Sequence, residues 1–154
     1  MRKVKKFKLT SEFIVDISGV KLFRIKALIE FGNVKAGDLG GYIEKEENLS
    51  HMGNAWVFGN AWVSGNARVS GDAWIYGDAR VSGDKDYAYA HGFGSCNRTT
   101  TFFRLKDGDV GVRCGCFYGT LAQFRDKVCE THGETKKAQE YLMLADLMEI
   151  RFKN

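Results

Sequence analysis

The residue types best suited to ligand chemistry gather in one short segment, HGFGSCNRTTTFFR, which spans residues 91–104. Hydroxyl groups and glycine backbone N–H groups stand there beside arginine guanidinium groups, a combination that suits a phosphate or pyrophosphate. Phenylalanine rings in the same segment offer a surface on which a base can stack. The predicted ligand-binding residues are Phe93, Ser95, Asn97, Arg98, Thr99, Thr100 and Arg104.

In this interpretation Arg98 pairs with a phosphate, the Ser and Thr hydroxyls donate to its oxygens, and Phe93 stacks on a base. A structural interpretation stays open beside it, because threonine-rich strands and Gly-Phe-Gly loops are common without any ligand. Neither the P-loop pattern nor the dinucleotide fingerprint G-x-G-x-x-G occurs in the segment.

Histidine is a frequent general base, and the chain contains three. His91 alone lies in a glycine-rich setting compatible with chemistry, so it is the catalytic candidate if the protein is an enzyme. We expect His51 to be a structural histidine with its hydrogen bonds satisfied, and His132 to interact with the last carbonyls of a helix. No other residue indicates catalysis, so the sequence favours a protein that is not an enzyme.

Two cysteines, Cys114 and Cys116, stand two positions apart on an expected strand and would therefore share a face. Cys96 or Cys129 could complete a metal site with them. A C-x-C pair without a second close pair is a weak signal, however, and half-buried cysteines often behave as small apolar residues. We expect neither a metal nor another cofactor.

A repeat over residues 53–83, GNAWVFGNAWVSGNARVSGDAWIYGDARVSG, sets the elements that must position these residues. Gly-Asn-Ala or Gly-Asp-Ala recurs every six residues, and Gly, Asn and Asp tolerate the left-handed backbone that a sharp corner requires. Each alanine and the aliphatic residue two places later, as at Ala55 and Val57, would point inward. Such a period predicts a parallel β-helix of short strands.

The flanking sequence divides the chain into an N-terminal strand cap (1–36), the repeat region (37–86) and a C-terminal hairpin with two helices (87–154). The segment FIVDISGVKLFRIKAL predicts two strands around Ser18-Gly19. Residues 99–105 and 110–117 are expected to form a hairpin with its turn at 107–109.

Two helices should end the chain. Thr120, with Gln123 three residues on, has the form of a capping box that opens a helix through Thr131, and Gly133 closes it. Apolar residues at spacings of three and four predict the last helix over about 134–151.

The repeat resembles the hexapeptide-repeat family of left-handed parallel β-helices, most strongly over residues 53–84. Three hexapeptides make one coil in that family, which implies that residues eighteen apart stack. The resemblance implies a mainly β fold, a short left-handed parallel β-helix with flanking α+β elements, and a homo-oligomer, most simply a trimer. Outward side chains would form its interface: Trp56, Phe58, Trp62, Trp74, Tyr76 and Arg80.

Two alternatives for these outward aromatic side chains stay open. They could pack against the protein's own N-terminal strands or C-terminal helices, or they could form a platform on which a ligand stacks.

The order of segments along nearly the whole chain also resembles small hexapeptide-repeat proteins encoded by phages and prophages. That resemblance implies a binding protein in the host cytoplasm that inhibits bacterial defence, either by sequestering a nucleotide signal or by binding a host protein. Many members of the wider family are acyl-CoA-dependent acyltransferases, which is the enzymatic alternative.

Composition narrows these classes. A hydrophobic content of 44% with 27% charged residues is typical of a globular domain, and a net charge of +4 suits an anionic small ligand better than nucleic acid. No apolar run approaches the roughly 20 residues of a membrane helix and no signal peptide is recognisable, so we expect a cytoplasmic protein with no membrane partner. The four cysteines should then be free thiols. We expect a non-enzymatic protein that sequesters an anionic, nucleotide-like small molecule.

Overall fold

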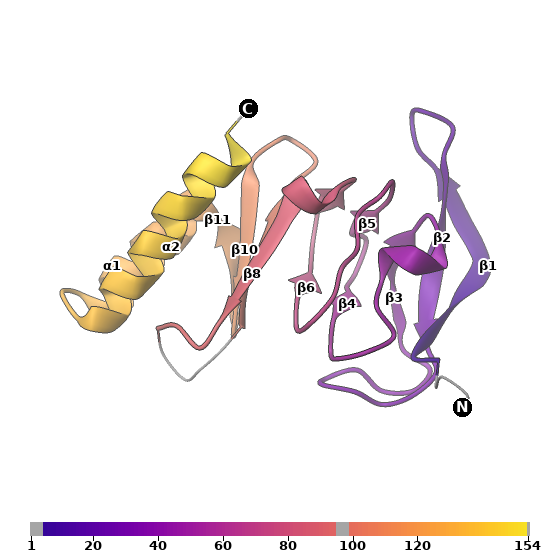
Figure 1. Cartoon of the computed structure of the whole chain (residues 1–154), viewed down its shortest axis with the longest axis horizontal. Coiled ribbons are helices and arrows are strands. Elements are labelled where there is room, and N and C mark those ends of the chain that lie inside the picture. Colours follow the sequence, from indigo (N-terminus) through magenta and orange to yellow (C-terminus); the bar gives the residue numbers. More distant parts are fainter. Residues whose placement is uncertain (1–4, 95–98, 154) are drawn as a thin grey trace.

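The computed structural model describes residues 5–94 and 99–153 of the chain. Its elements follow one another along one long axis, from an N-terminal hairpin at one end to two helices at the other (Figure 1). The repeat lies in the middle, where two of its strands continue the N-terminal sheet, and the C-terminal sheet lies on its other side. Residues from both sheets can therefore meet at the repeat.

The N-terminal sheet has five strands in the order β1-β2-β3-β5-β7. Its strands are β1 (Phe7–Val15), β2 (Lys21–Ala27), β3 (Leu39–Ile43), β5 (Trp62–Val63) and β7 (Arg80–Val81). The first three pair antiparallel, whereas β3, β5 and β7 pair in parallel. The sheet is therefore mixed.

Two further strands of the repeat, β4 (Trp56–Val57) and β6 (Trp74–Ile75), form a separate parallel pair. Trp56 lies opposite Trp74, eighteen residues away, and Trp62 lies opposite Arg80 at the same spacing. The short 3-10 helices η1 (Glu46–Asn48) and η2 (Asp84–Asp86) lie before and after the repeat.

The C-terminal sheet is antiparallel, in the order β11-β10-β9-β8. Its strands are β8 (Tyr87–His91), β9 (Thr99–Arg104), β10 (Val110–Cys114) and β11 (Phe117–Thr120). The helices α1 (Leu121–His132) and α2 (Lys136–Phe152) pack together on one face of it. Neither of these helices, in the part of the chain that is described, is long and apolar enough to cross a membrane.

The C-terminal sheet is buried on both faces. Phe103 on β9 belongs to the apolar core that fills the repeat and the N-terminal sheet, while its neighbour Phe102 belongs to a second core beneath the helices. Strand alternation explains the split, because successive side chains point to opposite faces. This sheet thus joins the helices to the repeat.

Burial confirms the inward positions of the repeat. Each of the following side chains is at most 1% exposed: Ala55, Val57, Ala61, Val63, Ala67, Val69, Ala73, Ile75, Ala79 and Val81. Small and aliphatic side chains at these positions let the turns of the repeat pack closely.

The prediction of a left-handed parallel β-helix is wrong. The described residues form mixed and antiparallel sheets and no closed solenoid. Each repeat strand has only two residues, so the repeat makes few parallel pairs, and antiparallel strands extend or adjoin it on both sides. The fold is mainly β with two helices.

Most local predictions outside the repeat are confirmed. β1 and β2 flank the turn that contains Gly19, and β9 and β10 form the expected hairpin. The single strand expected over 110–117 is wrong, because β10 ends at Cys114 and a separate antiparallel strand, β11, begins at Phe117. Thr120 and Gln123 form a reciprocal capping box at the start of α1, and Gly133 lies at its C-terminus.

Candidate functional site

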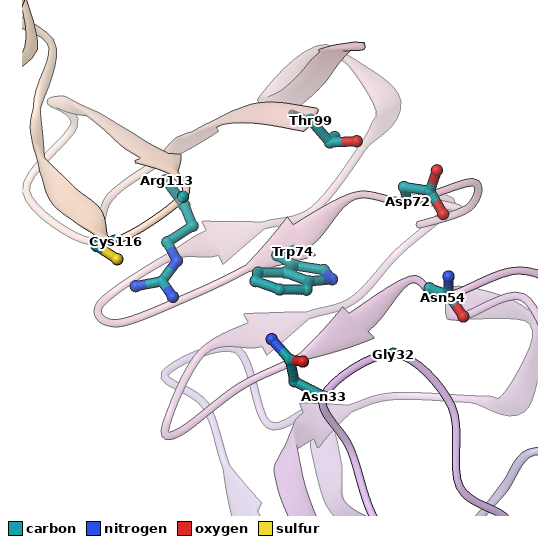
Figure 2. A pocket seen from close by; sticks show the side chains of 9 residues that line it. Gly32, Asn33, Asn54, Asp72, Trp74, Thr99, Arg113 and Cys116 are labelled. Carbon is teal, nitrogen blue, oxygen red and sulfur yellow. The ribbon is translucent and has the colours of Figure 1, made fainter. Parts of the chain in front are cut away.

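A cavity of about 440 Å³ lies where the repeat meets the loop after β2 and the C-terminal sheet (Figure 2). Ligand pockets in proteins typically measure roughly 300–1,000 Å³. Its lining combines one aromatic ring with charged, amide and thiol groups. The lining residues are Gly32, Asn33, Asn54, Asp72, Trp74, Thr99, Arg113, Gly115 and Cys116.

The repeat brings its part of the lining together by stacking residues eighteen positions apart. Gly71 precedes Asp72 and Gly53 precedes Asn54, and both glycines have positive φ, at 66° and 72°. A Cβ atom on Gly53 would lie 2.7 Å from the carbonyl oxygen of Gly71, so only glycine allows this close approach. Asp72 and Asn54 are therefore held as neighbours at one end of the cavity (Figure 2).

Trp74 forms the flat surface of the cavity. Its backbone N–H donates to Thr101 Oγ1 at 3.1 Å, and its ring makes an edge contact with Phe58 at 5.4 Å between centroids. The ring is only half-buried. Trp74 is thus held in place and still accessible from the cavity.

Arg113, on β10, points its guanidinium into the cavity beside Trp74 (Figure 2). The guanidinium carbon lies 4.8 Å from the centroid of the Tyr76 ring and 5.7 Å from that of Trp74, so both rings favour the cation. Its buried Nε has no hydrogen-bond partner, and the side chain donates to no described residue. Within residues 5–94 and 99–153, Arg113 is therefore a cation without an anionic partner.

Most other arginines of the described chain donate side-chain hydrogen bonds, and Arg68, whose side chain donates none, is exposed to solvent. Arg24 donates to Glu12, and Arg125 donates to Glu149. Arg151 donates to the backbone carbonyls of Asp84 and Tyr87. Because a half-buried guanidinium normally finds acceptors, the unpaired state of Arg113 indicates a place for an anion.

Three further polar side chains of the cavity have no partner among described residues. Among described residues, the side chains of Asp72, Asn54 and Asn33 form no hydrogen bond or ion pair. In Figure 2 the Trp74 ring lies between Arg113 on one side and Asp72 with Asn54 on the other. The cavity has a cationic end, a flat middle and an end rich in hydrogen-bond acceptors.

The structure separates the residues predicted from the sequence. Thr99 lines the cavity. Thr100 is 1% exposed and donates to Cys114 Sγ at 3.2 Å, so it faces the protein interior. Phe93 is 44% exposed and does not line the cavity. Ser95, Asn97 and Arg98 lie outside the described residues.

Arg104 has a structural role. Its Nε donates to Asp86 at 3.1 Å, and a terminal nitrogen donates to the carbonyl of Phe152 at 3.0 Å. Burial alone would raise the pKa of Asp86, but hydrogen bonds from Ser82 and Arg104 lower it below its ordinary value. Arg104 thereby ties β9 to η2 and to the end of α2.

The histidines fall into two settings. His91 Nδ1 lies 2.8 Å from Thr99 Oγ1, which places it beside the cavity. His51 accepts a hydrogen bond from the backbone N–H of Lys6 at 3.0 Å and stacks on Phe7 at 4.2 Å, as expected of a structural histidine. Its buried Nε2 has no hydrogen-bond partner among described residues and lies 3.6 Å from Glu46 Oε1, so the expected satisfaction holds for one ring nitrogen only. Burial lowers the pKa of His51.

The three described cysteines do not form a recognisable metal site, and Cys96 lies outside the described residues. Cys114 accepts from Thr100 and donates to Tyr141 Oη at 3.7 Å, while Cys116 is exposed at the cavity rim. In residues 5–94 and 99–153, no group of three or more His, Cys, Asp or Glu side chains could hold a metal ion.

The side chains expected to point outward as an interface have contacts within the chain. Trp56 is 1% exposed and is covered by Phe7 and Phe31. Trp62 lies beneath the guanidinium of Arg80, 3.8 Å from ring centroid to carbon. Phe58 and Tyr76 contact each other, and Tyr76 also contacts Tyr118. Trp56 is thus unavailable to a partner.

No protein-family model matches the chain, and comparison with curated proteins found no match. The resemblance to hexapeptide-repeat proteins, including those of phages and prophages, therefore has no support from family models, and the mixed and antiparallel sheets contradict it. Function has to be argued from the cavity itself.

Sequence reasoning missed Arg113, Asp72, Asn54 and Asn33 as site residues. Arg113 directly precedes Cys114 in the segment RCGC, and the two cysteines of this segment indicated a metal site and not an anion site. Strand alternation was a usable signal, because it places Arg113 on the opposite face from the apolar Val112. The corner residues gave no such signal, because Asn or Asp recurs at every repeat.

Proposed function

We propose that the protein binds a small anionic, nucleotide-like molecule in the cavity between the repeat and the C-terminal sheet, without transforming it. The anion would meet Arg113 and a planar group would stack on Trp74. The single observation that supports this proposal most is the unpaired, half-buried guanidinium of Arg113 beside an accessible indole ring.

The charge and shape of the cavity favour this ligand class. A guanidinium presents its N–H groups in a planar fork that matches phosphate and carboxylate oxygens. An indole ring offers a stacking surface for a base, worth roughly 1–3 kcal/mol per base in nucleic-acid complexes. Asp72 at the far end disfavours a ligand that is anionic along its whole length.

The absence of catalysis is also part of the proposal. His91 contacts Thr99 at the cavity, but no acidic side chain among the described residues contacts its ring and orients it as a general base. If the protein were instead an acyltransferase, His91→Ala should abolish turnover of an acyl-CoA.

A retention experiment tests the proposal. Purified protein is incubated with a pool of nucleoside monophosphates, cyclic dinucleotides, ADP-ribose and acyl-CoAs, washed, denatured, and the released molecules are identified by mass spectrometry. We expect an intact nucleotide from the wild type and at least tenfold less from Arg113→Gln, since charge-assisted contacts contribute about 1.5–3 kcal/mol.

Arg68→Gln is the matched control, because Arg68 is exposed and does not line this cavity. Equal retention by Arg113→Gln and the wild type would contradict the proposal. A chemically altered ligand would favour the enzyme, and an empty protein would favour a macromolecular partner.

We further propose that copies of the chain associate with one another in the cytoplasm. The tip of the β1–β2 hairpin exposes apolar side chains, with Ile17 at 106% and Val15 at 53% exposure, and β1 is an edge strand of its sheet. The free thiols Cys114, Cys116 and Cys129 fit a reducing compartment. Light scattering at several concentrations tests the association, and its measured mass decides whether the assembly is the expected trimer.

A further inference from the structure

The end of the cavity formed by Asp72 and Asn54 can select among bases by their hydrogen-bond donors. Asp72 reaches it from the repeat, and its carboxylate has no hydrogen-bond or ion-pair partner among the described residues. It is half-buried, so solvent satisfies it only in part. A ligand that fills the cavity must therefore supply donors to this carboxylate or leave a charged group unpaired.

An ionised carboxylate accepts hydrogen bonds and donates none, and its two oxygens can accept from two parallel N–H groups at once. Among the common bases, guanine offers two adjacent donors on one edge, the ring N1–H and the exocyclic N2–H. Adenine and cytosine place an acceptor nitrogen next to their amino group on that edge, and uracil places carbonyl oxygens beside its N–H. The carboxylate therefore matches guanine.

The remaining groups fit the same orientation. Trp74 lies between Asp72 and Arg113 in Figure 2, so a base that stacks on the indole ring can present one edge to Asp72 while its phosphate approaches Arg113. Asn54, next to Asp72, has an amide N–H₂ that can donate to the carbonyl oxygen on the same side of guanine.

We propose that the cavity is selective for guanine nucleotides, and that the Asp72 carboxylate recognises guanine by accepting hydrogen bonds from its N1–H and N2–H groups. This inference rests on the proposed function and names the ligand class of the same site. It needs no covalent step, because recognition uses only hydrogen bonds, stacking and one ion pair.

Asp72 is not set apart by the repeat pattern alone, because Asp78 occupies the equivalent position one repeat later. Asp78 is exposed and does not line the cavity. The two aspartates therefore form a matched pair at the same repeat position, of which only Asp72 lines the cavity. Asparagine occurs naturally at this repeat position, as in Asn54, so an Asp→Asn change should leave the fold intact.

Isothermal titration of the wild type with four monophosphates tests the selectivity. GMP has both donors, IMP lacks the exocyclic amino group, AMP lacks the donor pair, and XMP places a second carbonyl oxygen opposite the carboxylate. We expect GMP to bind at least about tenfold more tightly than IMP, because IMP loses a hydrogen bond to a charged group. AMP and XMP should bind more weakly still.

The Asp72→Asn variant sharpens the test. We expect its affinity for GMP to fall at least about tenfold and its affinity for XMP to rise, because the new amide donates to the second carbonyl oxygen of xanthine. Asp78→Asn should bind all four nucleotides as the wild type does.

The outcomes separate the two proposals. If AMP binds as tightly as GMP, or if Asp72→Asn keeps the preference for GMP, guanine selectivity is overturned while anion binding at Arg113 stands. If none of the four nucleotides binds the wild type, both the selectivity and the proposed nucleotide ligand are overturned.

Discussion

Two pairs of stacked repeat strands have nearly the same sequence, but an arginine near each pair is in a different environment. In one, Trp62 pairs with Arg80, and in the other Trp56 pairs with Trp74 beside Arg113. Arg80 donates to the carbonyls of Ala79 and Asn60 and covers Trp62 closely. Arg113 donates to no described residue and leaves Trp74 accessible.

The difference shows that the repeat supplies the scaffold and the flanking segments decide which part of it becomes a site. Arg80 belongs to the repeat and is satisfied by its own backbone and by Asn60. Arg113 comes from the C-terminal sheet, and no described acidic side chain forms an ion pair with it in the cavity.

Trp56→Ala should have the largest effect on stability. Its side chain is 1% exposed between Phe7 and Phe31, so its removal should lower the free energy of unfolding by about 3–5 kcal/mol. Trp74→Ala removes a half-buried ring and should cost only about 1–2 kcal/mol. Urea denaturation measures both, and equal losses would contradict the distinction between a buried and an accessible ring.

Lys6 lies in the segment that covers Trp56, and its titration should make the free energy of unfolding depend on pH. Burial lowers the pKa of Lys6 to about 8, while its ammonium group donates to the carbonyl of Ala55 at 2.6 Å. Between pH 8 and the ordinary lysine pKa of 10.5, the unfolded chain holds a proton that the folded chain has lost.

The free energy of unfolding should therefore rise with pH across that interval, by at most about 3 kcal/mol. Denaturation at several pH values between 7.5 and 10 measures the rise. Lys6→Met should remove it, and a rise of the same size in Lys6→Met would assign the effect to other groups.

Arg113→Gln should weaken ligand binding by about 10- to 150-fold, which corresponds to the 1.5–3 kcal/mol of a charge-assisted contact. Arg80→Gln should leave binding unchanged, because its guanidinium lies over Trp62 and outside the cavity. Isothermal titration with the retained nucleotide compares them. Equal weakening in both variants would mean that general positive charge, and no specific site, attracts the ligand.

For stability, the order of the two effects should be opposite, with the larger loss in Arg80→Gln. Arg80→Gln removes a cation–π contact and should lower the free energy of unfolding by about 0.5–1 kcal/mol. Arg113→Gln loses only more distant cation–π contacts, at 4.8 and 5.7 Å, and it relieves the burial of an Nε that has no hydrogen-bond partner among described residues. The free energy of unfolding should therefore stay within about 0.5 kcal/mol. A larger loss in Arg113→Gln would indicate that Arg113 serves the fold.

The sequence predicted the elements that depend on local signals. Gly19 marked the first hairpin, the turn at 107–109 marked the second, and Thr120 with Gln123 marked the start of α1. The inward positions of the repeat were also recognisable, because small and aliphatic residues recur with a fixed period.

The global fold was not predictable from the period alone. Strands of two residues pair in parallel at the expected spacing, but antiparallel strands on either side decide the sheets. The site was missed for a similar reason. Asp72 and Trp74 are about forty residues from Arg113 in the sequence. Long-range contacts of the C-terminal sheet with the repeat, such as the packing of Phe103 and the hydrogen bond from Trp74 to Thr101, bring β10 to them.

The most direct test of the account is the fluorescence of Trp74 during titration with GMP. Trp56 is buried and Trp62 is covered by Arg80, so a ligand in the cavity should change the emission of Trp74 alone. We predict saturable quenching in the wild type that Trp74→Phe abolishes and Arg113→Gln shifts to higher GMP concentration. Quenching that persists in Trp74→Phe, or no quenching of the wild type, would contradict the claim that this cavity is the binding site.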